Sequence, residues 1–196
     1  MTQRYSTPHF SSHIRFWMTL LCIGAIFWLG GIVMRALIAN EFFVPGTLEF
    51  LPDISLDQER TLFQLVSAAS TMMLICYGVV LVSAIVLLRI LPLRRKDNGW
   101  LLMASILFFL FVPVEMFTGY LDLQFILLWN NTKDLLSLHG IETYAQHSTM
   151  MRATLSHRIG ALSGLPVIAT LCYFTAVILL IWQPMRFRSP DAGEHT

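Results

Sequence analysis

The chain has 196 residues, of which 56% are hydrophobic and only 13% are charged, and its formal net charge is +1. Soluble domains carry about 25% charged residues, so this composition excludes an ordinary soluble domain and is typical of a membrane protein. Because the net charge is close to zero, no basic field favours nucleic acid as a partner. The lipid bilayer is the first partner that the composition indicates.

Four long apolar segments follow one another along the chain, each near or above the about 20 residues that cross a bilayer as a helix. The first is too long for a signal-peptide core and no A-x-A cleavage site follows it, so we expect it to be retained. The sequence therefore predicts one all-α membrane domain over 1–196, a four-transmembrane-helix bundle. Its spans are expected at about 16–39, 62–88, 99–121 and 159–182, with longer connections at about 40–61 and 122–158.

Three local patterns predict details of the last two spans. Pro113 removes a backbone donor and should kink the third span one turn before Glu115. Gly160 and Gly164 have small-xxx-small spacing, which favours close packing of the fourth span against a neighbour. Residues 142–157 have the pattern of an amphipathic helix that leads into the fourth span.

The distribution of basic residues predicts the orientation. The segments 1–15, 89–98 and 184–196 together hold eight Lys and Arg residues, whereas the two longer connections hold four. Basic residues concentrate in cytoplasmic segments, so both termini are expected in the cytoplasm and the two connections outside.

The first span carries a stripe of small and functional side chains on one helical face. Gly24, Trp28, Gly31 and Arg35 recur at intervals of four, three and four residues, which places them along one side of a helix. The glycines allow another helix to approach closely, so we expect this stripe to face the inside of the bundle.

The third span carries a comparable stripe that contains an acidic residue within the apolar run. Glu115, Thr118, Gly119 and Asp122 share one helical face. A carboxylate near a helix centre costs about 2.5 to 3.5 kcal/mol on insertion scales, so Glu115 is a candidate site residue. Counted at 1.5 Å per residue, Arg35 and Glu115 lie about 6 and 9 Å inside the outer ends of their spans, a depth at which they can form an ion pair.

Three interpretations of Arg35 and Glu115 stay open from the sequence. Arg35 can extend to the outer head groups while Thr, Tyr or water holds Glu115. The two can form a structural ion pair. They can also belong to a functional site for a proton, an ion or a ligand.

Histidine and methionine side chains in the second connection suggest a possible metal site. His147, Met151 and His157 bring soft sulfur and imidazole ligands to one outer helix, a composition that Cu(I) accepts. None of the six histidines is central in a span, which disfavours haem held by two facing imidazoles, although His157 could hold an interfacial haem. Copper and haem therefore remain alternative cofactors, and neither is favoured.

The string AIFWLGGIVMRALI at 25–38 resembles the first helix of small bacterial four-helix membrane proteins of the copper-resistance D and HemJ-like type. The resemblance rests on Trp28, the following glycine pair and Arg35, and on a later Thr-Gly pair that here is Thr118 and Gly119. It implies a four-helix protein of the bacterial inner membrane. Leu21 stands where haem-binding or metal-binding relatives carry His, so the resemblance does not extend to that ligand.

These patterns favour a non-enzymatic, multi-pass protein of the bacterial inner membrane with an outward-facing polar vestibule for a small ligand, an ion or a lipid head group. One alternative is an accessory or assembly subunit that contacts other membrane subunits. The other is a membrane protein that handles copper or haem. The residues expected to line the vestibule are Trp28, Arg35, Glu115, Thr118 and Asp122.

Overall fold

The computed structural model describes residues 12–44, 47, 49–90, 99–139, 141–162 and 164–182. In these residues the structure is helical, apart from turns and an isolated antiparallel bridge between Phe43 and Phe50. The helices are α1 (Ser12–Asn40), α2 (Leu56–Ile90), α3 (Gly99–Leu110), α4 (Val112–His139), α5 (Ile141–Gly160) and α6 (Leu165–Trp182).

Within the residues that the structure describes, four segments are long and apolar enough to cross a membrane, as judged by length and composition. They are α1, α2, the stretch Gly99–Asp134 that joins α3 to most of α4, and α6. The all-helical class and the four apolar segments of the sequence prediction are thus confirmed. The fourth segment begins at Leu165 rather than near residue 159, because α5 ends at Gly160.

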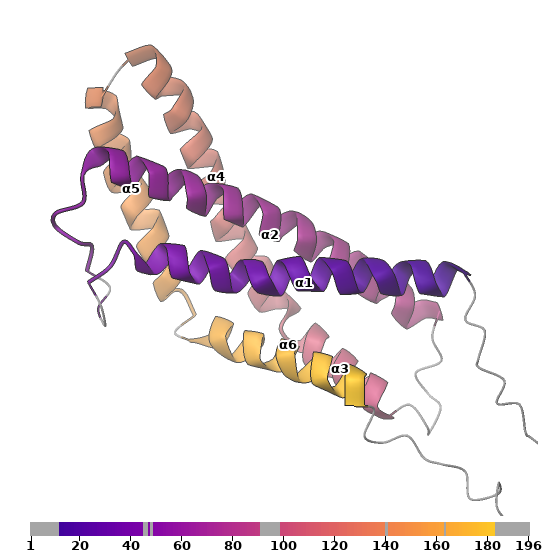
Figure 1. Cartoon of the computed structure of the whole chain (residues 1–196). Coiled ribbons are helices and arrows are strands. Elements are labelled where there is room, and N and C mark those ends of the chain that lie inside the picture. Colours follow the sequence, from indigo (N-terminus) through magenta and orange to yellow (C-terminus); the bar gives the residue numbers. More distant parts are fainter. Residues whose placement is uncertain are drawn as a thin grey trace, which may run out of the picture.

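The helices form two antiparallel pairs and a hairpin that projects from them (Figure 1). The long helices α1 and α2 lie side by side, and the shorter α3 and α6 form a second pair. The hairpin of α4 and α5 stands at the side of the molecule where α1 ends and α2 begins, which we call the hairpin side. A helix of 29 or 35 residues is about 44 or 52 Å long, so α1 and α2 exceed the about 30 Å of a hydrocarbon core.

Glycines set the spacing between α1 and α2, as the stripe on the first span predicted. A Cβ atom on Gly31 would lie 2.8 Å from Cγ of Met73, and one on Gly24 would lie 3.0 Å from a methyl group of Val80. Gly30, next to Gly31, has nothing within 4 Å. The face of α1 that carries Gly24 and Gly31 therefore packs on α2.

The third apolar segment is broken where Pro113 predicts a kink. Helix α3 ends at Leu110, Phe111 forms a turn, and α4 begins at Val112. Helix α3 alone is about 18 Å long and too short to cross a bilayer, so it needs the first turns of α4. The break lets α3 pair with α6 while α4 crosses toward α2 and α5.

The connection between α5 and α6 corrects one expectation. Gly160 and Gly164 were expected to bring the fourth span close to a neighbour, yet a Cβ atom on either would meet nothing within 4 Å. Gly164 instead has φ of +91°, a backbone conformation that favours glycine, and Leu162 has φ of +65°. These residues turn the chain between two helices, so Gly164 is needed for conformation rather than for packing.

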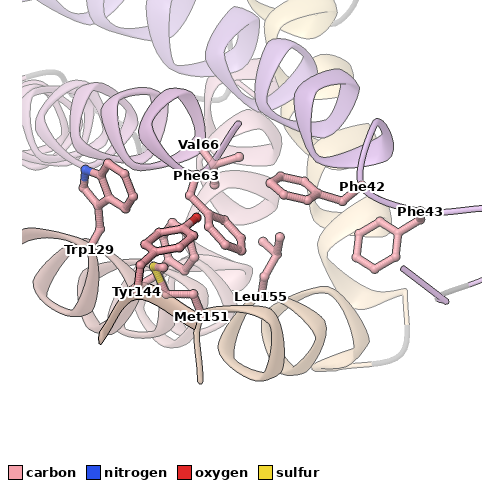
Figure 2. Close-up of a cluster of buried hydrophobic side chains, with 9 residues drawn as sticks. Phe42, Phe43, Phe63, Val66, Trp129, Tyr144, Met151 and Leu155 are labelled. Carbon is pink, nitrogen blue, oxygen red and sulfur yellow. The ribbon is translucent and has the colours of Figure 1, made fainter. Parts of the chain in front are cut away.

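Aromatic and aliphatic side chains form a core on the hairpin side, where α1, α2, α4 and α5 meet (Figure 2). The ring of Phe63 on α2 stacks on Phe42 at 4.9 Å between centroids and meets Phe125 of α4 edge-on. The other buried members are Phe43, Val66, Trp129, Tyr144, Met151 and Leu155. This core seats the α4–α5 hairpin on the ends of α1 and α2.

A buried ion pair also ties α5 to α2. Nε and Nη2 of Arg152 donate to the two carboxylate oxygens of Glu59 at 2.8 and 2.7 Å, and the Ser148 hydroxyl donates to the first oxygen at 3.0 Å. These hydrogen bonds raise the pKa of Arg152 above its usual value, and burial raises the pKa of the nearby Tyr144 phenol. Glu59 is 1% exposed, and a charge buried to this degree needs bonded partners. Arg152 and Ser148 supply them.

Candidate functional site

A cavity of about 350 Å³ lies between the core of the hairpin side and a second aromatic cluster around Trp28. Side chains of α1, α2, α4, α5 and α6 line it. All five residues that the sequence singled out are among them, namely Trp28, Arg35, Glu115, Thr118 and Asp122. The structure therefore gathers these residues around one space.

Asp122 is the centre of the polar wall. Nη1 and Nη2 of Arg35 donate to its two oxygens, Oδ2 and Oδ1, each at 2.5 Å. Nε of Arg158 on α5 donates to Oδ1 at 2.9 Å, and its Nη2 lies 3.4 Å from Oδ2. Arg35 is 6% and Asp122 is 4% exposed, whereas the Arg158 side chain is 19% exposed, so a buried ion pair is joined by a second, partly exposed guanidinium group.

Arg35 pairs with Asp122 and not with Glu115, its partner in one of the three interpretations of the sequence. That expectation measured depth from a third span that ended at residue 121. Helix α4 continues to His139, so residue 121 is not its outer end. A depth counted from residue 121 is therefore too small. Asp122, which was expected on the same helical face as Glu115, lies two helical turns beyond it and meets Arg35 directly.

Glu115 has no hydrogen bond or ion pair from its carboxylate to any side chain in the described residues. Its backbone carbonyl accepts a bond from the Thr118 hydroxyl at 3.2 Å. The charges of Arg158, Asp122 and Arg35 all act on the carboxylate, which is half-buried in the cavity wall. When it is ionised, Glu115 therefore adds a negative charge that the cluster around Asp122 does not hold directly.

Aromatic rings close the cavity on the side away from the hairpin. The Trp28 ring packs against Tyr77 of α2 and Tyr173 of α6, with centroid distances of 5.0 and 4.8 Å. Tyr77 is 7% exposed and lines the cavity, and its hydroxyl has no hydrogen-bond partner among the described residues. The Tyr173 hydroxyl likewise has no partner among these residues, but of the two tyrosines only Tyr77 lines the cavity.

The mouth of the cavity lies between α1 and the start of α6. The exposed lining residues include Ala36 and Asn40 on α1 and Gly164 and Val167 on the α6 side. The Val167 side chain is apolar and 65% exposed, so the mouth has an apolar edge beside the polar wall.

Comparison with known proteins finds no family model, curated protein or solved structure that matches the chain. The site is therefore interpreted from its own geometry.

Arg158 and Tyr77 are site residues that the sequence reasoning missed. Arg158 was counted only as a basic residue of an outer connection, and Tyr77 lies in an otherwise apolar run. One signal for Arg158 existed, because Ser148, Arg152 and Arg158 fall on the inner side of α5 together with the buried Leu155. The inner face of an amphipathic helix can thus carry paired charges as well as apolar residues.

The metal site considered at His147, Met151 and His157 is not assembled. Met151 is fully buried in the core of the hairpin side, whereas His157 is exposed. The two histidines are ten residues apart on one continuous helix, which separates their backbones by about 15 Å. Metal–nitrogen bonds of about 2 Å cannot bridge that distance, so these three side chains cannot share one copper ion. The exposure of His157 likewise gives a haem no enclosing pocket there.

Proposed function

We propose that this chain is a multi-pass membrane protein that binds a small ligand or a lipid head group in the cavity of Arg35, Asp122 and Arg158. The observation that carries the proposal is a pair of arginines, one buried and one partly exposed, that share one buried carboxylate in the wall of an open cavity. The role is binding rather than catalysis, as the sequence patterns favour.

The arginine groups retain capacity for a ligand. A guanidinium has five N–H donors, and Asp122 takes two nitrogen contacts from each arginine. Protein interiors are close-packed, so a purely structural cluster would be covered by side chains rather than by open space. The cavity of about 350 Å³ is at the small end of the range for ligand sites, about 300–1,000 Å³.

The mouth supports a ligand that reaches the site from the bilayer. With both termini in the cytoplasm, the hairpin side faces outward and the cavity lies at the level of the outer leaflet. The exposed flanks of Ala36 and Val167 would then face lipid. The polar part of a small amphiphile can enter the cavity while its apolar part stays outside. This arrangement fits an inner-membrane protein of bacteria.

The test compares two tryptophan substitutions on neighbouring residues of α1. Ala36 lines the mouth, whereas Leu37 is 59% exposed and is not part of the lining. We expect Ala36→Trp to fill the mouth and to abolish lipid adducts in native mass spectra of protein purified in detergent with an added total bacterial lipid extract. Leu37→Trp should retain the adducts of the unchanged protein.

Both variants add the same ring to an exposed position, so they should fold equally well by circular dichroism. Equal adducts on Ala36→Trp and Leu37→Trp, or no adduct on the unchanged protein, would refute binding in this cavity.

A further inference from the structure

We infer that the ligand of this cavity is a zwitterion that carries a phosphate or carboxylate and a primary ammonium group. This inference rests on the proposed function and names the chemistry that the site selects. It follows from the placement of charged side chains along α4, which gives the two ends of the polar wall opposite electric charge.

The end of the wall at Asp122 is positive. Two guanidinium groups outnumber the one carboxylate that they share, so Arg35, Arg158 and Asp122 carry one net positive charge together. Guanidinium groups present parallel N–H donors that match the oxygens of a phosphate or carboxylate. An anionic group beside Asp122 can accept hydrogen bonds from the arginine N–H groups that do not contact Asp122.

The other end of the wall is negative. Glu115 is seven residues before Asp122, which places it on the same face of α4 about 10 Å away along the helix. Thr118 lies between them and is buried, and the Tyr77 hydroxyl stands at the same end without a hydrogen-bond partner in the described part of the chain. A primary ammonium has three N–H donors, which the Glu115 carboxylate and the Tyr77 oxygen can accept.

Charge balance favours a neutral ligand with separated charges. The positive cluster and Glu115 cancel, so the empty site has no net charge when all four groups are ionised. A monoanion or a monocation would leave an uncompensated charge in a poorly solvated cavity, which is costly. A zwitterion places its anion at the arginines and its cation at Glu115, so no charge in the occupied cavity is left uncompensated.

The same chemistry has two sources, a lipid head group and a water-soluble molecule. Phosphatidylethanolamine would enter through the mouth at Val167 with its chains against the exposed flanks of α1 and α6. Free glycerophosphoethanolamine, a phosphodiester with the same neutral head group as the lipid, would enter from the outer solution. Both place the phosphate at the arginines and the ammonium at Glu115.

The experiment measures native mass spectra of the full chain in detergent with one added lipid at a time. We expect phosphatidylethanolamine to bind at least about tenfold more tightly than phosphatidylglycerol, which has the phosphate but no ammonium, since one charge-assisted contact is worth roughly that factor. Glu115→Gln should remove this preference, and Tyr77→Phe should reduce it. Phosphatidylcholine, whose ammonium has no N–H donor, should lose most of the advantage.

Adding free glycerophosphoethanolamine distinguishes the sources. Displacement of phosphatidylethanolamine at comparable concentration would assign the site to a soluble zwitterion, and no displacement would assign it to the lipid. Equal or tighter binding of phosphatidylglycerol, or an unchanged preference in Glu115→Gln, would overturn the inference. That result would leave the proposed function standing, because the comparison of Ala36→Trp with Leu37→Trp tests occupancy of the cavity without regard to head-group charge.

Discussion

The two acidic residues on the cavity face of α4 should contribute very differently to stability when each is changed to the matching amide. Asp122→Asn and Glu115→Gln each convert a carboxylate into an amide of the same shape, on one helix and two turns apart. Asp122 holds two arginines through four nitrogen contacts, whereas the Glu115 side chain holds none in the described residues. The pair of variants therefore isolates the contribution of the ion-pair cluster.

The magnitude follows from burial. Removing one partner of a buried ion pair costs about 3–5 kcal/mol, because the other charge stays buried without compensation. Arg35 has a side chain only 8% exposed and carries the full penalty, while Arg158 at 19% is partly solvated and adds less. The Asn oxygen still accepts one hydrogen bond, so we expect a loss of about 3 kcal/mol for Asp122→Asn. Glu115→Gln should change the unfolding free energy by less than about 1 kcal/mol, because no bonded partner is lost.

The assay is equilibrium unfolding in mixed detergent micelles with increasing dodecyl sulfate, followed by circular dichroism. A third variant, Arg35→Met, removes one of the two guanidinium groups that lose compensation in Asp122→Asn. Combined with Asp122→Asn it should cost less than the sum of the two single changes. If Glu115→Gln destabilises the protein as much as Asp122→Asn does, the assignment of Arg35 to Asp122 is wrong.

Two further predictions concern backbone positions, each with a matched glycine as its control. Gly31→Ala should destabilise the protein by about 1–3 kcal/mol relative to Gly30→Ala, because the new methyl group would lie 2.8 Å from Met73 while Gly30 faces open space. The comparison uses the same unfolding titration, and equal values would show that α1 does not pack on α2 at this point. Gly164→Ala should cost about 1 kcal/mol more than Gly160→Ala, since both sites are open but only Gly164 has positive φ. Equal thermal midpoints of these two variants would contradict the turn conformation between α5 and α6.

The sequence was sufficient for features that depend on periodicity. The stripe of Gly24, Trp28 and Arg35 on the first span is buried, as its spacing predicts. The break before Pro113 follows from the missing backbone donor. Thr118 and Asp122 reach the same cavity as Glu115 because a helix repeats its face every seven residues.

The sequence was insufficient for features that depend on how helices cross. Glu115 was considered as a partner of Arg35 by counting depth along two separate spans, and this count cannot include the extension of α4 beyond the apolar run. Arg158 reaches Asp122 only because α5 folds back along α4, a contact between residues 36 positions apart. The glycine pair on the fourth span has the spacing of a packing motif, yet Gly164 serves a turn.

Helix α5 carries two of the arginines that hold other helices, Arg152 on Glu59 of α2 and Arg158 on Asp122 of α4. They are six residues apart, so a rigid helix joins their positions over about 9 Å. A force applied to the projecting hairpin would thus act on both attachments at once. Helix α5 thereby connects the buried Glu59 of α2 mechanically to the wall of the cavity, so a displacement of the hairpin would shift Arg158 as well as Arg152.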